Sequence, residues 1–158
     1  MRPDPYPPLI SPRSPSYERA WREFPQPSDE ANAELVALVA RLSEAEQNAG
    51  SLCASMAARL DDDELAEVLR DRSDLHQARR QALGKLIERF GGSPPTDAEC
   101  RTILTRTSDA ADPADSTADV ERALEILRDE LGGEYRAALA HERLEEAQRS
   151  ALSALAPA

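Results

Sequence analysis

Proline is concentrated at the start of this chain, and this distribution constrains the fold more than any other feature of the sequence. Eight of the twelve prolines lie within the first 27 residues. Because the proline ring fixes φ and removes a backbone hydrogen-bond donor, this stretch can form neither a long helix nor a central strand. The sequence therefore predicts a Pro-rich arm over residues 1–27 and a folded part over residues 28–158.

The apolar residues of the chain favour helices over strands. Hydrophobic residues make up 41% of the 158 residues, which is enough to bury a core, whereas aromatic residues reach only 4%. Ala and Leu dominate, and the β-branched and aromatic residues that strand-rich folds need are scarce. We therefore expect an all-α protein.

The charge balance excludes two classes of partner. Thirty acidic and 19 basic residues give a net charge of −11, and such a surface repels phosphate backbones and anionic lipid headgroups. No stretch approaches the roughly 18 apolar residues of a membrane-spanning helix, and prolines stand where a signal peptide needs its apolar region. We expect a cytoplasmic protein that binds neither nucleic acid nor membrane.

Beyond residue 28, apolar residues recur every three or four positions, which is the spacing of one helix face. The first two predicted helices form an antiparallel hairpin, and the long connection after them can return over the length of a helix. Thr96 and Glu99 have the capping-box spacing that begins a short helix in this connection. Gly132 and Gly133 either break the following helix or permit a close contact. The predicted helices span residues 28–60, 62–90, 97–106, 116–140 and 143–156.

Polar residues interrupt the apolar stripe at the middle of the second predicted helix. Arg72, His76 and Arg79 occupy positions whose phase is set by Leu69 and Leu83. Since the first helix offers acidic and amide residues at the same height, we expect Arg–carboxylate pairs and hydrogen bonds to form a buried polar layer that fixes the helix register. The alternative is that these residues are exposed on a stripe of different phase.

Three features together resemble a small bacterial ferritin-like four-helix-bundle family of largely unknown function: the long hairpin, the crossover after residues 90–92, and the segment 130–135. The resemblance covers about residues 32–141. It implies either a dinuclear iron or manganese centre or a bundle that has lost one. The residues it offers as metal ligands are Glu44, Glu46, His76, Glu130, Glu134 and His141.

The two histidines depart from the ligand motif of such metal centres. The motif needs Glu three residues before each His, and this chain has Ser73 before His76 and Ala138 before His141. Arginines beside His76 would also repel a cation. We therefore predict that the chain holds no metal and no cofactor, and retain an iron or manganese site as the alternative.

The arm carries three aromatic residues at helical spacing. Tyr17, Trp21 and Phe24 follow one another at i, i+4 and i+7, so a short helix would place them on one face. Large aromatic side chains of this kind anchor a segment in an apolar groove. The groove belongs either to the protein's own bundle or to a partner, which is another protein or a second copy of the chain.

No motif for catalysis is present. The chain has no nucleophile elbow, phosphate loop or dinucleotide-binding glycine pattern, and Cys53 and Cys100 are too far apart for a Cys metal motif. The short last helix leaves one end of the apolar groove without a cover, which a homodimer or a protein partner would supply. We therefore predict a non-enzymatic helical-bundle scaffold or protein–protein interaction module. The alternative is a ferritin-like di-metal binding or oxidative-stress protein with a degenerate metal site.

Overall fold

The computed structural model describes residues 29–157, and every regular element in this range is a helix, which confirms the all-α prediction. The aromatic residues Tyr17, Trp21 and Phe24 lie outside the described residues. Within the described range no helix has the length and apolar character needed to cross a bilayer. The elements are α2 (Asp29–Arg59), α3 (Asp63–Arg89), the 3₁₀ turn η1 (Asp97–Glu99), α4 (Thr105–Ala111), α5 (Thr117–Leu139) and α6 (Glu146–Leu155).

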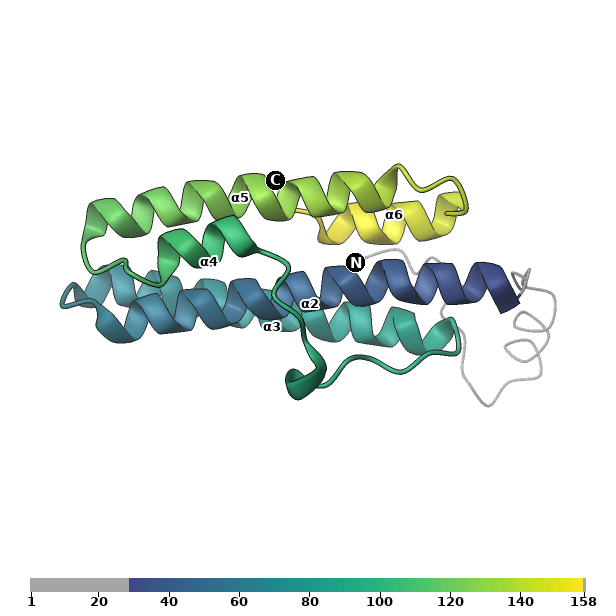
Figure 1. Cartoon of the computed structure of the whole chain (residues 1–158), viewed down its shortest axis with the longest axis horizontal. Helices are drawn as coiled ribbons and strands as arrows, with labels where there is room; N and C mark the ends of the chain where they lie inside the picture. The colour runs from purple at the N-terminus through teal and green to yellow at the C-terminus, as the bar shows by residue number, and fades with distance from the viewer. Residues whose placement is uncertain (1–28, 158) are drawn as a thin grey trace.

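Helices α2 and α3 form a long antiparallel hairpin (Figure 1). The Asp62 side chain caps α3 by accepting a hydrogen bond from the backbone N–H of Leu65 at 3.1 Å. The other end of α3 closes in a Schellman motif, in which Gly91 takes a φ of +85° and the Gly92 N–H donates to the Ile87 carbonyl at 3.0 Å. Both ends agree with the helix predicted over residues 62–90.

The connection between α3 and α5 crosses over α2, and its helix lies further along than predicted (Figure 1). The capping box of Thr96 and Glu99 is present, but it begins only the single turn η1. After η1 the chain does not return to helix until Thr105, so the predicted helix over residues 97–106 is wrong. The reason is that side chains of α2 take the backbone N–H groups of this segment, as described below.

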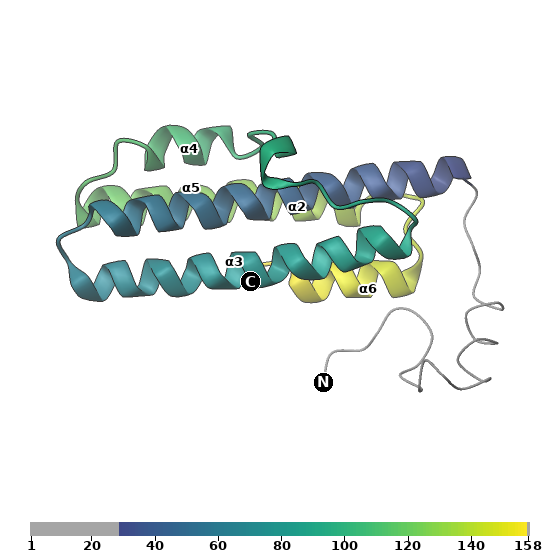
Figure 2. The ribbon, with the colours of Figure 1, turned by 90° about the horizontal axis from the view of Figure 1, so that it is seen from below.

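The helices form two layers, with α5 over α2 and the short α6 over the C-terminal half of α3 (Figures 1 and 2). Helix α4 lies along α2 and α5 on the opposite side from α6 (Figure 2). The core between the layers is built from Leu, Ala, Val and Ile side chains of all five helices, joined by Cys53, Met56, Phe90 and Tyr135.

Helix α5 runs without interruption through Gly132 and Gly133. A Cβ atom at Gly132 would meet only the Arg136 guanidinium, at 3.2 Å, so this glycine pair is neither a turn nor a close contact with another helix. The chain turns instead after α5, where Arg149 donates from Nε to the Leu139 carbonyl at 3.1 Å and so satisfies the end of α5. This turn agrees with the break predicted near residues 140–143.

Candidate functional site

Three side chains from three helices meet in the interior at what we call the polar centre: Glu46 of α2, His76 of α3 and Tyr135 of α5. The His76 Nδ1 atom lies 2.6 Å from Glu46 Oε2, and the Tyr135 hydroxyl donates to Glu46 Oε1 at 2.7 Å. Glu46 has no exposed surface, and His76 and Tyr135 are buried. Each oxygen of the buried carboxylate therefore has its own partner.

Burial and hydrogen bonding hold the three side chains of the polar centre in one arrangement. A buried carboxylate is costly unless it is hydrogen-bonded, and both bonds here are of the charge-assisted kind. Burial raises the pKa of Tyr135 far above its ordinary range, and the nearby charge of Glu46 and their hydrogen bond raise it further. Tyr135 is thus a neutral hydrogen-bond donor at any physiological pH.

A glycine and a serine bring α2 and α3 together beside the polar centre. Ser73 Oγ donates to the Gly50 carbonyl at 2.9 Å. A Cβ atom at Gly50 would lie in ordinary contact with His76 Cβ, at 3.5 Å, so α2 and α3 are close together at this point. The serine at the position where a metal-binding motif has Glu therefore ties the two helices together.

The predicted polar layer is right in the burial of His76 and wrong in the role of Arg72. Arg72 is exposed, although it lies only about 40–60° around α3 from His76 and Leu69. Arg79 is partly buried, and its charge lowers the pKa of Tyr135 against the larger effects of burial and Glu46. Histidine and tyrosine, not Arg72, hold the buried acid.

Tyr135 is the residue of the polar centre that was not predicted from the sequence. It lies on the apolar stripe of α5 and packs as a core residue through its ring. Its spacing from Leu131 and Ala138 is that of any core position. The one signal in the sequence that could have identified Tyr135 is its hydroxyl, because a buried tyrosine needs a hydrogen-bond partner.

A second cluster on the opposite face of α2 holds the crossover, and we call it the crossover clamp. Glu44 accepts two bonds from the Arg101 side chain, at 2.9 and 3.0 Å, and one from its backbone N–H at 2.8 Å. Asn48 Oδ1 accepts from the N–H groups of Ile103 and Leu104 at 2.6 and 3.1 Å. In a helix over residues 97–106 these N–H groups would donate to backbone carbonyls. Because they donate to side chains of α2 instead, the predicted helix does not form.

Arg80 of α3 completes the crossover clamp. Its guanidinium donates to the side chains of Gln47 and Asp97 and to the Pro95 carbonyl. For Glu44, burial acts to raise the pKa, but the hydrogen bonds and charge of Arg101 outweigh it and hold the pKa below its usual value. An arginine does neutralise a buried acid in this protein, but it comes from the crossover and was not predicted.

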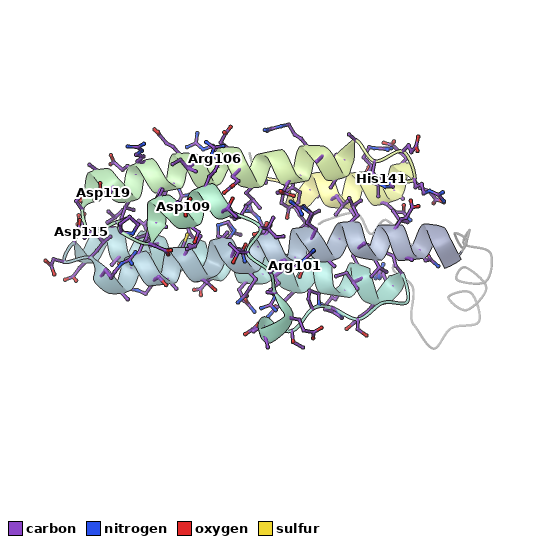
Figure 3. The ribbon with its side chains drawn as sticks, viewed as in Figure 1. Arg101, Arg106, Asp109, Asp115, Asp119 and His141 are labelled. Atoms are coloured by element: carbon purple, nitrogen blue, oxygen red, sulfur yellow. The ribbon has the colours of Figure 1, made fainter. Side chains whose placement is uncertain are left out.

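The remaining candidate metal ligands are separated from the polar centre. Glu130 accepts from the backbone N–H groups of Arg106 and Thr107, at 3.1 and 2.9 Å, and so caps α4. Glu134 forms a bidentate pair with Arg41 at 2.7 and 2.9 Å. His141 lies in the turn between α5 and α6, near one end of the molecule (Figure 3).

The six candidate ligands therefore do not converge. Over residues 29–157, no three His, Cys, Asp or Glu side chains form a group that could hold a metal ion. Only Glu46 and His76 of the predicted set are in contact, and Tyr135 takes the position beside them. The described part of the chain thus does not fit the di-metal centre that the ferritin-like resemblance implies.

The two cysteines are not reactive thiols. Burial raises the pKa of Cys53 to about 11, so its side chain is a protonated core group near neutral pH. Burial also raises the pKa of Cys100, although the nearby charge of Arg80 acts to lower it. Both cysteines are free.

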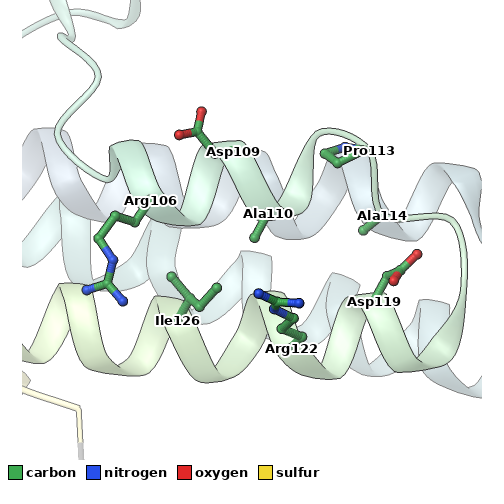
Figure 4. A pocket seen from close by; sticks show the side chains of 8 residues that line it. All are labelled: Arg106, Asp109, Ala110, Pro113, Ala114, Asp119, Arg122 and Ile126. Carbon is green, nitrogen blue, oxygen red and sulfur yellow. The ribbon is translucent and has the colours of Figure 1, made fainter.

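A surface hollow of about 610 Å³ lies between α4 and α5 (Figure 4). Arg106 of α4 and Arg122 of α5 border it, with Ile126 between them, while Asp109 points away from α5 (Figure 4). All four charged residues of its rim, which include Asp119, are exposed to solvent. With two positive and two negative groups in water, the hollow has no net charge and no buried polar group to select a ligand.

Helix α3 carries the two large apolar side chains that are most exposed in the described structure. Val68 is 47% exposed and Leu75 is 49% exposed. They are seven residues apart, so they lie on the same face of α3 about two turns from each other. This face is the second candidate for function, after the polar centre.

Comparison of the chain with protein-family models, with curated proteins and with solved structures finds no match. The function is therefore inferred from the contacts within this chain.

Proposed function

We propose that the protein is a non-enzymatic, ferritin-like helical bundle that serves as a protein–protein interaction module. The observation that carries the proposal is that Glu46, the one completely buried acid of the bundle, has both oxygens bound by the protein's own His76 and Tyr135. A centre built this way fixes three helices relative to one another. It supports a structural role for the residues that a ferritin-like enzyme would use for chemistry.

The other acids that were candidate metal ligands also support a structural role. Glu44, Glu130 and Glu134 are each held by different protein donors. Moving them to a common metal would break the crossover clamp, the cap of α4 and the pair with Arg41. Such a rearrangement would cost several hydrogen bonds to charged groups, each worth about 1.5–3 kcal/mol.

The exposed Val68 and Leu75 favour interaction as the activity of this scaffold. Large apolar side chains on one face of a helix, in a protein whose surface is otherwise strongly charged, are typical of a binding surface. The partner is another protein or a second copy of this chain.

Two measurements test the proposal. Protein purified after incubation with iron or manganese is expected to contain no stoichiometric metal, and stoichiometric metal bound through Glu46 and His76 would overturn the structural role. Tagged protein expressed in its source cells is expected to recover a stoichiometric complex that the double variant Val68→Ser, Leu75→Ser does not recover. Recovery of the wild-type chain alone would contradict an interaction module.

A further inference from the structure

The crossover is held out of a helix that its own sequence favours. The capping box of Thr96 and Glu99 has formed, and residues 100–104 are the non-helical stretch between η1 and α4. Because both neighbours of this stretch are already helical, a helix over 97–111 would need only propagation through it and no new nucleus. Local sequence and fold disagree here, and such disagreements are expected at functional or strained sites.

A helix over 97–111 would keep the buried face of α4. One face of that helix would carry residues spaced by four, three and four positions, which are Cys100, Leu104, Thr107 and Ala111. Leu104, Thr107 and Ala111 are already buried, and Cys100 is partly buried. The longer helix would therefore continue the face that α4 already packs against α2 and α5.

Three side chains take the place of the backbone acceptors of that helix. Glu44 and Asn48 of α2 and Glu130 of α5 accept from the N–H groups of Arg101, Ile103, Leu104, Arg106 and Thr107. In a helix over 97–111 these N–H groups would donate to carbonyls four residues earlier in the chain. Side chains that bind backbone N–H groups compete with helix formation in this way.

The crossover has enough chain to convert. Pro94 lies over Gly84, and the Pro95 carbonyl accepts from Arg80, so after Phe90 the crossover runs back along α3 by about 9–15 Å (Figure 1). Residues 100–104 would shorten by about 9 Å in total, from about 3.3 Å to about 1.5 Å per residue. The N-terminal end of α4 faces the end of the molecule where α3 ends (Figures 1 and 2). A longer α4 would therefore point back toward the end of α3, and the retraced length can supply it.

Glu44 is the clamp residue whose hold depends on charge. Its buried carboxylate accepts three bonds from Arg101, and a negative charge strengthens each of them. The charged groups that act on it are Arg101 of the crossover and Arg41 of α2, which pairs with Glu134 of α5. On the side of α3, Glu44 and Arg80 both act on the Cys100 thiol. A neutral Glu44 would lose its charge-assisted bonds to Arg101.

We propose that the crossover is a conformational switch, in which residues 100–104 stay extended while Glu44 is charged and residues 97–111 become one continuous helix when Glu44 is neutral. Conversion would free the side chains of Glu44 and Asn48 on α2. The two states would therefore present different surfaces of α2 to the surroundings. This inference goes beyond the proposed function and does not depend on it.

The test follows the Cα chemical shifts of residues 100–104 by NMR in the full-length protein. At neutral pH the wild type is expected to give non-helical shifts. The double variant Glu44→Gln, Asn48→Ala is expected to move them to the helical side of the random-coil values. Glu34→Gln changes an acid of the same helix that pairs with Arg143, and is expected to leave these shifts unchanged.

Thr102 distinguishes a new helix from a loosened loop. Its side chain is exposed, so a substitution there changes helix propensity without removing a buried contact. In the Glu44→Gln, Asn48→Ala background, Thr102→Ala is expected to increase the helical shifts and Thr102→Gly to decrease them. In the wild-type background at neutral pH, neither substitution is expected to make residues 100–104 helical.

An acid titration of the wild type tests the role of charge. The Arg101 hydrogen bonds and charge hold the pKa of Glu44 below its usual value of 4.5, so helical shifts are expected only below that pH. The near-ultraviolet signal of tyrosine shows whether the core is still folded at each pH. If the double variant does not fold, this titration decides alone.

Three outcomes would overturn the switch. Random-coil shifts in the Glu44→Gln, Asn48→Ala variant would show that the crossover is only released, and unchanged shifts would show that the clamp is not what keeps it extended. Equal responses to Thr102→Ala and Thr102→Gly in that background would also contradict a helix. In the titration, the contradicting result is a core that unfolds before residues 100–104 become helical.

Discussion

Tyr135 contributes a hydrogen bond at a place where the rest of its helix contributes only apolar packing. Its hydroxyl donates to Glu46, which has no exposed surface, so removing the hydroxyl leaves one carboxylate oxygen without a partner. The substitution Tyr135→Phe is expected to lower the free energy of unfolding by about 1–3 kcal/mol, measured by urea denaturation. Ser150→Ala, at an exposed position of α6, is a control that should change it by less than about 0.5 kcal/mol. Equal changes in the free energy of unfolding for the two substitutions would show that the hydroxyl does not stabilise the fold.

Glu44 predicts a pH dependence of stability. Its pKa lies below the usual value of 4.5, because the hydrogen bonds and charge of Arg101 outweigh the effect of burial. A carboxyl group with a lowered pKa in the folded state stabilises the protein above its unfolded pKa, and this contribution disappears as the pH falls through the folded pKa. The difference in unfolding free energy between wild type and Glu44→Gln is therefore expected to be largest at neutral pH and to shrink below pH 4.5. A difference that stays constant from neutral to acidic pH would contradict this.

At the residue scale the sequence identified His76 and Glu46 but not their partner. His76 interrupts an apolar stripe and Glu46 lies at its height on a neighbouring helix, so periodicity was enough to bring both into consideration. Arg101 and Tyr135 were missed because each acts across more than 50 residues of sequence, on Glu44 and Glu46 respectively. Helical periodicity carries no information about such distant pairs.

At the element scale, Gly92 determines how the hairpin connects to the crossover. A Cβ atom there would lie 2.7 Å from Cγ1 and 2.9 Å from Cγ2 of Val36 on α2. Gly92→Ala is therefore expected to destabilise the protein by about 1–3 kcal/mol. Adding Val36→Ala to this variant is expected to cost less than Val36→Ala costs in the wild type, because it removes the clash. A double-mutant cycle measured by urea unfolding checks the coupling, and additive effects would contradict it.

Gly133 is expected to behave in the opposite way. It lies inside α5, and a Cβ atom there would meet only the flexible Arg136 guanidinium, at an ordinary 3.7 Å. Gly133→Ala is therefore expected to raise the free energy of unfolding by up to about 1 kcal/mol, since Ala favours helix over Gly. A loss of stability would mean that the glycine serves a contact that the isolated bundle does not show.

The elements that the sequence predicted well are those whose signals are local. The predicted ranges 28–60, 62–90 and 116–140 lie within one residue of α2, α3 and α5 at each end, because apolar periodicity and caps act within a few residues. The predicted helix over 97–106 failed because Asn48 and Glu44, on a different element, take the N–H groups of the crossover. A capping box marks a helix start, but it does not set the length of the helix.

At the scale of the whole molecule, one polar centre connects α2, α3 and α5. Loss of α3 or α5 would leave one oxygen of Glu46 without its partner in the interior, so the three helices are expected to unfold together. Thermal unfolding followed by helical ellipticity and by the near-ultraviolet signal of tyrosine should show the same midpoint. Two separate transitions would mean that the hairpin is stable without α5.

Helix α2 performs two tasks over five consecutive residues, with Glu46 directed to the interior and Glu44 and Asn48 directed to the crossover. One residue added or removed between them would rotate everything on one side by about 100° about the helix axis, so no adjustment of rotamers could serve both tasks. The length of this stretch is thus fixed more tightly than its composition. A natural variant of the protein can exchange side chains here in compensating pairs, but it cannot tolerate an insertion or a deletion.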